Sequence, residues 1–239
     1  IVNDDFCRQT SIKIRGTFNR KRSDGEFIGA FAPYGYFKDP KDKHKFIVDE
    51  YASSIVKDIF TWFLAGESKR GINLKLNDLG IPCPTMYKKS IGLNYKNPHT
   101  RNDKGLWNSR TIDTILRNQV YIGHMVQGRY KVKSYKVHKQ VSVPEDEWFI
   151  VKNTHEPIID KEMFEKAQKL LLRDIKTANH QRNTYLFSGL LRCADCNMAM
   201  HRKISGNYVY YACRTYKEQS KAACSPHTIR EDELENAVL

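Results

Sequence analysis

The chain has 239 residues, a formal net charge of +13 and 40% hydrophobic residues, a composition that suits packed domains and excludes a disordered chain. No apolar run approaches the roughly 20 residues that a membrane-spanning helix needs, so we expect a cytoplasmic protein with no membrane partner. The excess of cations predicts a polyanionic partner. Nucleic acid fits better than a membrane surface, because the basic residues do not follow one amphipathic helix.

The chain begins without Met and in the middle of a pattern, so we expect it to be part of a longer protein. Its first 22 residues start with acidic side chains and end with three cations, which are Arg20, Lys21 and Arg22. This polarity matches a helix dipole and predicts a helix whose basic end approaches DNA phosphates, with Gly16 weakening or ending it. A solvated helix end is the alternative.

The next segments predict a mixed domain. Residues 27–36 combine aromatic and small side chains with a proline, which indicates an ordered loop or short strands. Apolar residues recur at helical spacing over residues 48–64, and a second helix is expected over residues 68–79, ended by Gly80. A long polar loop is expected from there to residue 106.

A short helix with a Ser or Asn cap is expected within residues 107–118. With the preceding helix it could form a helix-turn-helix that places a recognition helix in the major groove, although any small helical pair looks similar and the intervening loop is unusually long. The candidate DNA-binding residues here are Ser109, Arg110, Thr111, Thr114 and Arg117. We expect Arg110, Thr111 and Thr114 at base edges and Arg117 at a phosphate.

A strand is expected over residues 120–126, and a cationic connector follows. Residues 128–139 hold five cations and no acid. They form either a solvated linker or, as we favour, a connector that lies along a DNA groove and releases counterions there. Phosphate contacts are expected from Arg129, Lys131 and Lys133.

Residues 143–151 are expected to open a second domain. A helix capped by Asp160 should follow and pack beside the cysteine-rich segment further on. Residues 185–191 read as a strand that leads to Cys193, and another helix starts near residue 228.

Four cysteines predict a zinc ribbon. Two residues separate Cys193 from Cys196, and Cys213 and Cys224 supply a second pair that completes a tetrahedral shell for Zn²⁺. The segment between Cys196 and Cys213 reads as strand, Ser-Gly-Asn turn and strand. The alternatives are a disulfide framework or a redox pair. Because the second pair is widely spaced, His201 and His227 are candidate substitute ligands.

Removing one of these thiolates should unfold the ribbon, which has little apolar core of its own. Weaker candidates for a second DNA contact lie on its strands and are Arg202, Lys203 and Tyr208.

Taken together, these segments resemble the C-terminal DNA-binding part of the large serine recombinases, the integrases and transposases of phages and mobile elements. The resemblance is carried by GAFAPYGY at 29–36, by residues 107–123, by THEPII at 154–159 and by YLFSGLLRC at 185–193 with the ribbon that follows. These motifs cover nearly the whole chain in family order.

The resemblance implies an α+β fold, with a mainly helical, helix-turn-helix-like recombinase domain followed by a small α/β zinc-ribbon domain. Residues 1–22 would be the end of a long helix from a catalytic domain, 23–128 the recombinase domain, 129–142 a basic linker and 143–239 the zinc-ribbon domain. The four cysteines carry over as ligands of a structural Zn²⁺.

The family's reaction uses a serine nucleophile in a catalytic domain that this sequence lacks. The resemblance therefore implies that this chain binds double-stranded DNA half-sites at attachment sites or transposon ends without cutting them. It also implies that the full-length protein acts as a dimer or tetramer on DNA, in the cytoplasm of a bacterial host. We assign no catalytic residue.

Two rival hypotheses come from other classes. One is a stand-alone regulator that combines a helix-turn-helix with a zinc ribbon. The other is a metal-dependent nuclease that uses His155 and Glu156, but adjacent residues in an extended segment point to opposite faces and make a poor ligand pair.

Overall fold

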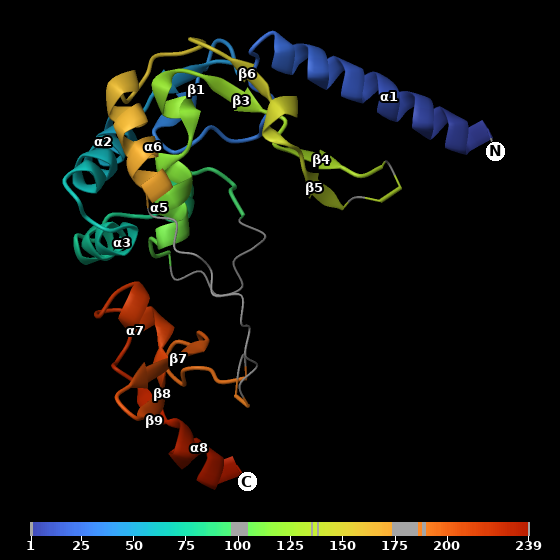
Figure 1. Ribbon diagram of the computed structural model, residues 1–239. Helices are drawn as coiled ribbons and strands as arrows, with labels where there is room; N and C mark the ends of the chain where they lie inside the picture. Colours follow the sequence, from blue (N-terminus) through green and yellow to red (C-terminus); the bar gives the residue numbers. More distant parts are fainter. Residues whose placement is uncertain are drawn as a thin grey trace. The chain divides into compact units, whose positions relative to one another are not determined.

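The computed structural model describes residues 2–96, 105–134, 136–137, 139–173, 186–187 and 190–238 (Figure 1). The chain divides into two compact units, Ile1–Thr61 with Leu116–Lys169 and Trp62–Ile115 with Leu170–Leu239. The described residues form helices and small antiparallel sheets of two or three strands. This arrangement confirms the α+β class. None of the helices in the described ranges is long and apolar enough to cross a membrane.

The chain starts with α1 (Val2–Ser23), which carries acidic residues in its first turn and basic residues in its last. Of the two effects expected of Gly16, ending the helix is excluded, because α1 continues through it to Ser23. The position where a Gly16 Cβ would lie is open space, so no neighbouring group forces a break there. A single glycine in a helix costs only about 1 kcal/mol relative to alanine, which the other residues of this long helix offset.

Residues 27–35 form the ordered-loop alternative, with bends and turns and no strand. The first strands come after them and are β1 (Tyr36–Lys38) and β2 (Phe46–Val48), which pair antiparallel. The helix predicted over residues 48–64 is confirmed as α2 (Glu50–Leu64). It starts at Asp49, whose carboxylate accepts a hydrogen bond from the Ala52 N–H at 3.1 Å. Such a cap satisfies one of the N–H groups that a helix start leaves without a partner.

The second predicted helix is confirmed as α3 (Lys69–Asp78), with the Ser68 side chain accepting from the Gly71 N–H. Gly80 follows at φ +68°, as a helix-ending glycine should. The polar loop expected after it contains a helix instead, α4 (Pro84–Ser90), which starts with proline in its first turn. Residues 97–104 of that loop lie outside the described ranges.

The short helix expected within residues 107–118 is α5 (Ser109–Leu116). Its cap is Asn108, whose side-chain oxygen accepts from the Thr111 N–H at 2.9 Å. The apolar positions Ile112, Ile115 and Leu116 are buried.

Residues 119–122 do not form the expected strand. They form the 3₁₀ helix η1 (Gln119–Ile122), which Asn118 caps and Gly123 ends at φ +82°. The carbonyl of Tyr121 accepts from the N–H groups of Ile158 and Ile159, at 3.0 and 2.9 Å. These long-range bonds hold the turn closed, and a strand begins only at β3 (Met125–Gln127).

The basic connector folds into a hairpin of β4 (Tyr130–Val132) and β5 (Gln140–Ser142) rather than running as an extended linker. After η2 (Glu145–Glu147), β6 (Phe149–Val151) pairs antiparallel with β3, so this stretch belongs to the first unit. The backbone N–H and C=O groups of β3 find their hydrogen-bond partners in β6, so this part of the chain is held in the first unit.

The helix capped by Asp160 is α6 (Lys161–Arg173), and it contacts other elements of the first unit. Its Phe164 ring lies 6.1 Å from the Phe60 ring of α2. The Gln168 side chain donates to the Leu116 carbonyl at 2.7 Å. Both contacts lie within the first unit.

The ribbon hairpin is confirmed. Strands β7 (Met200–Ser205) and β8 (Tyr208–Cys213) pair across a turn at Gly206, and β9 (Thr228–Arg230) pairs with β8. The short helix α7 (Arg214–Glu218) follows β8, and α8 (Glu231–Val238) ends the described chain. Of the strand expected over residues 185–191, Leu186 and Phe187 lie in a turn, and residues 185, 188 and 189 are outside the described ranges.

Candidate metal centre and nucleic-acid interface

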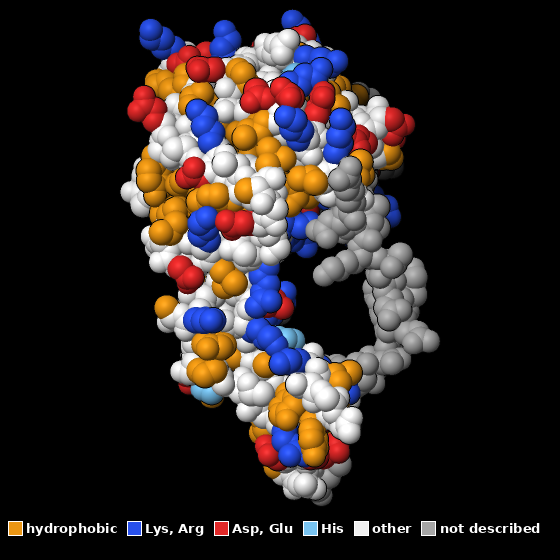
Figure 2. Space-filling model, turned by 60° about the vertical axis from the view of Figure 1, so that its left-hand side comes forward, with side chains coloured by type: hydrophobic (Ala, Val, Ile, Leu, Met, Phe, Trp, Pro, Cys, Tyr) orange, Lys and Arg blue, Asp and Glu red, His pale blue; other side chains and the backbone are white. Residues whose placement is uncertain are grey.

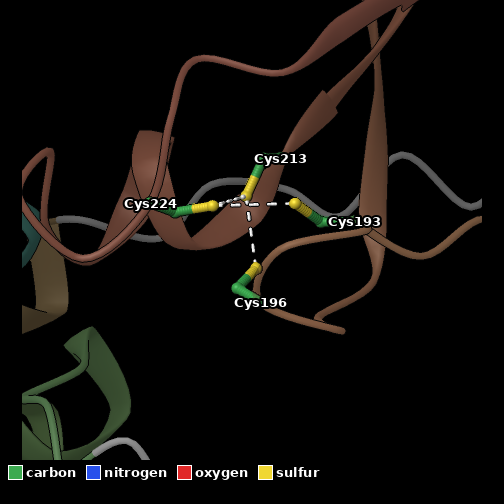
Figure 3. Close-up of side chains that lie close together, drawn as sticks. All are labelled: Cys193, Cys196, Cys213 and Cys224. Atoms are coloured by element: carbon green, nitrogen blue, oxygen red, sulfur yellow. Dashed lines mark hydrogen bonds between the residues drawn. The ribbon is translucent and has the colours of Figure 1, made fainter.

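The four ribbon cysteines point toward one another (Figure 3). The Sγ atoms of Cys193 and Cys224 lie 3.6 Å apart, those of Cys196 and Cys213 lie 3.5 Å apart, and those of Cys213 and Cys224 lie 3.6 Å apart. All four lie within 4.8 Å of one another. A Zn–S bond of about 2.3 Å places the sulfurs of a tetrahedral site roughly 3.8 Å apart. The thiol cluster therefore has the size that a tetrahedral zinc ion needs.

Each pair of cysteines is held by local backbone structure. The turn between Cys193 and Cys196 closes with the Asn197 N–H donating to the Cys193 carbonyl at 2.8 Å, and Asn197 adopts φ +54°. Cys213 ends β8, and its N–H donates to the carbonyl of His227 at 2.9 Å, which brings the Cys224 loop close. The metal-binding geometry thus comes from a turn, a strand end and one strand pairing.

Burial alone would raise the pKa of the Cys196 thiol, but its hydrogen bonds with Thr215, with the Met198 backbone and with neighbouring thiols lower it to about 6. Burial raises the pKa of Cys213 and, for Cys224, raises it to about 12. Four thiolates packed at these distances repel one another. The donor set therefore fits a divalent cation that favours all four thiolates together.

The two histidine alternatives differ in position. The Nδ1 atom of His227 lies 3.3 Å from the Cys193 Sγ and 3.9 Å from the Cys224 Sγ, while its Nε2 lies 3.4 Å from the Asp195 carboxylate. His227 also forms a second possible metal group with Asp195 and Cys224. His201 belongs to neither of the groups found among the described residues.

Candidate DNA contacts on α5 fall into two kinds. Arg110 and Thr114 are exposed and lie one helical turn apart, and Arg117 is exposed just after the helix. Thr111 is half-buried. The hydroxyl of Ser109 accepts from the Asn73 side chain at 2.9 Å, so it serves packing between α3 and α5.

The three cations that end α1 are not equally accessible. Arg20 is exposed. Lys21 donates to Glu26 at 2.9 Å, and the Arg22 guanidinium donates to Asn19 and lies 5.8 Å from the Phe149 ring centroid. Lys21 and Arg22 therefore fix the end of α1 against the segments that follow it.

The hairpin cations also differ. The Arg129 guanidinium donates to the Asn118 side chain at 3.0 Å and lies 5.0 Å from the Trp148 ring centroid. Burial lowers its pKa, so Arg129 is a partly buried structural cation. Lys131 and Lys133 are exposed, and Lys131 pairs loosely with Glu147 at 3.4 Å.

On the ribbon, Arg202 pairs with both carboxylate oxygens of Glu231, at 3.2 and 3.3 Å, and Tyr211 donates to the same carboxylate at 2.9 Å. The two side chains of the ion pair are each only 20% exposed. Arg202 therefore ties β7 to α8. Lys203 and Tyr208 are exposed. Sequence reasoning missed Lys217, which lies close to Lys203, because no pattern indicated α7.

On the face that Figure 2 displays, Lys and Arg side chains are spread widely and are interspersed with Asp and Glu. The positive charge on this face is therefore not gathered into one patch. Local geometry, rather than total charge, has to identify the contact residues.

The family model described as Recombinase matches residues 50–174, just over half of the chain. The chain belongs to the recombinase family. A second model, described as Recombinase zinc beta ribbon domain, matches residues 186–239 and contains the thiol cluster.

Two curated relatives are from Bacillus subtilis (strain 168). The chain is 30% identical to "Uncharacterized protein YefB" over 154 residues, which are 64% of this chain and 50% of the relative. It is 28% identical to "Putative DNA recombinase" over 225 residues, which are 86% of this chain and 41% of the relative. The chain thus spans half or less of the length of these relatives.

Two solved structures are also similar. The structure titled "Sequence Requirements of the Listeria innocua prophage attP site" has 22% identity and a TM-score of 0.43, covering 93% of this chain and 83% of that chain. "Crystal Structure of a LSR-DNA Complex" has 22% identity and a TM-score of 0.42, covering 95% of this chain and 63% of that chain.

Proposed function

We propose that this chain is the DNA-binding part of a serine site-specific recombinase, and that it binds double-stranded half-sites at the ends of a mobile element. The observation that carries the proposal is the succession of a recombinase domain and its zinc ribbon in one chain. The net charge of +13 fits a polyanionic partner. The parent protein would act as a dimer or tetramer on DNA in the cytoplasm.

The domain boundaries expected from the sequence need adjustment within this proposal. The recombinase match extends to residue 174, and β6 and α6 make their contacts with elements of the first unit. We therefore assign residues 143–173 to the recombinase domain and begin the zinc-ribbon domain near residue 186. The helix α1 would connect this DNA-binding part to a catalytic domain.

The proposed metal is a structural Zn²⁺ held by Cys193, Cys196, Cys213 and Cys224. Support comes from the spacing of their sulfur atoms and from the zinc-ribbon match. When bound, the ion joins the first cysteine turn to β8 and to the loop before β9. The buried members of the apolar cluster at this site are Cys193, Cys196 and Cys213 themselves, so metal binding would contribute directly to the folding of the ribbon.

Within the recombinase domain we propose that Arg110, Thr111 and Thr114 approach base edges, while Arg117, Lys131 and Lys133 meet phosphates. The exposure of Arg110 and of the two hairpin lysines supports this division. Ser109, Lys21, Arg22 and Arg129 make contacts within the protein, and we propose that they position the DNA-binding elements instead.

A pair of variants tests this division. Arg110→Ala should relax the preference at one base position by about 1–3 kcal/mol and leave non-specific binding nearly intact. Lys131→Ala should weaken binding to all duplexes and lower the slope of log K against log salt by about 0.9. The measurement is a salt titration by fluorescence anisotropy on a half-site and on single-base variants of it. Identical behaviour of the two variants would contradict the division.

The function as a whole is tested by titrating the zinc-loaded chain against a candidate half-site and a scrambled duplex, before and after chelation. Preference for the half-site that falls on chelation supports readout by two domains with a structural metal. Equal affinity for both duplexes, unchanged by the chelator, would refute sequence-specific binding. If the chain prefers the half-site but the full-length protein does not cut DNA, the regulator hypothesis would be favoured.

A further inference from the structure

A pocket of 290 Å³ lies in the ribbon on the side of β8 and α7. Lys203 of β7 and Lys217 of α7 both line it, although they come from different elements. The other residues that line this pocket and carry a hydroxyl group are Ser205, Tyr210, Tyr216 and Thr228. Ammonium groups and hydroxyls can all donate hydrogen bonds, so the lining is rich in donors.

The two lysines bring like charges together. Both side chains line the same pocket. Burial, followed by the charges of Lys203 and Arg70, lowers the pKa of Lys217, and the charge of Glu218 partly opposes this shift. Within the described ranges neither lysine forms an ion pair with a carboxylate. Glu218, the nearest acid in sequence, pairs with Arg214 at 2.7 Å. Glu218 partly offsets the repulsion between the two cations, but its carboxylate is held by Arg214 and forms no ion pair with either lysine.

Two neighbouring cations that line one pocket and have no described carboxylate ion-paired to them are stabilised when an anion binds between them. A phosphate group suits this site, because lysine binds phosphate as a compact point charge and the hydroxyls add neutral donors. Lys203 is exposed, so a long polyanion can approach it without entering the pocket completely.

We propose that this pocket binds one phosphodiester group of the DNA backbone, held between Lys203 and Lys217. The inference rests on the proposed DNA-binding function and gives the ribbon its own anchoring point on the duplex. This pocket takes the place of Arg202 as the expected DNA contact of the ribbon, because the Arg202 guanidinium is hydrogen-bonded to Glu231.

The test compares Lys203→Gln, Lys217→Gln and the double variant with Lys221→Gln. Lys221 is an exposed lysine outside the pocket lining, so its variant removes the same charge from the same domain. Zinc content and circular dichroism establish that each ribbon is folded. If Lys217→Gln unfolds, the exposed Lys203→Gln variant still decides the question. DNA affinity is then measured by fluorescence anisotropy over a range of chloride concentrations.

The double variant should bind DNA about tenfold more weakly and lower the salt slope by about one, while Lys221→Gln stays close to wild type. Replacing chloride by inorganic phosphate at constant ionic strength should inhibit the wild type more than the double variant. Equal losses in the Lys221→Gln control would overturn the pocket in favour of a diffuse basic surface. Unchanged DNA binding in the folded variants would also overturn it, even if inorganic phosphate binds there. Absence of DNA binding by the wild type would instead refute the proposed function itself.

Discussion

Replacing Gly123 by alanine should lower the free energy of unfolding of the recombinase domain by more than the cost of a positive φ angle alone. Gly123 ends η1 at φ +82°, and a Cβ added there would lie 2.8 Å from the backbone oxygen of His155. The carbonyl of Gly123 also accepts a hydrogen bond from the Thr154 N–H at 2.9 Å. The 154–159 segment would therefore have to move away from η1 to make room.

Two costs add in this variant. Holding a non-glycine residue in the left-handed region costs about 1–2 kcal/mol. Forcing an extra carbon against packed backbone costs typically about 1–3 kcal/mol more. The expected total is roughly 2–5 kcal/mol. Gly80→Ala is the matched control, because Gly80 has φ +68° with nothing within 4 Å of the Cβ position, so it keeps only the first cost.

The assay is urea unfolding of both variants, followed by tryptophan fluorescence and circular dichroism, with the free energies taken from linear extrapolation. Gly123→Ala should lose at least about 1 kcal/mol more than Gly80→Ala. Equal losses would show that the contact between η1 and the 154–159 segment relaxes freely. That result would refute the claim that this contact fixes the turn.

The remaining predictions concern the ribbon and one buried histidine. Cys213→Ala should abolish stoichiometric zinc binding in mass spectrometry and unfold the ribbon, whereas Cys7→Ala, at an exposed cysteine of α1, should do neither. Arg202→Ala should destabilise the ribbon by about 1 kcal/mol in thermal unfolding, because it leaves the Glu231 carboxylate without its cationic partner. A change in the salt dependence of DNA binding in this variant would instead mean that Arg202 contacts a phosphate. Burial, partly offset by a hydrogen bond to a backbone carbonyl, lowers the pKa of His155 in the folded state. Its contribution to stability is therefore complete above the unfolded pKa of about 6.5 and is lost as the pH falls below it, so unfolding of a His155→Gln variant should depend less on pH between about 7 and 5.

The sequence by itself determined the elements whose signals are local. Helices α2 and α3 follow from apolar spacing, a Ser68 cap and the glycine at residue 80. The ribbon hairpin follows from β-forming residues on either side of a glycine turn. The thiol cluster follows from cysteine spacing, since a metal site needs only a few chemically specific residues. For the helices and the hairpin, the residues that decide the structure lie within a few positions of one another. The cysteines are further apart in the chain, but their residue type alone marks them as metal ligands.

The tertiary structure alone decided the features that depend on distant partners. Residues 119–122 have strand-forming side chains, yet hydrogen bonds from Ile158 and Ile159 hold them as a 3₁₀ turn. The pairing of β3 with β6 assigns residues 143–151 to the first unit. Arg202 resembles a DNA-binding cation in the sequence, but Glu231, 29 residues later, occupies it. No local pattern contains this information, because a backbone or charged group takes its partner from whatever segment the fold brings within reach.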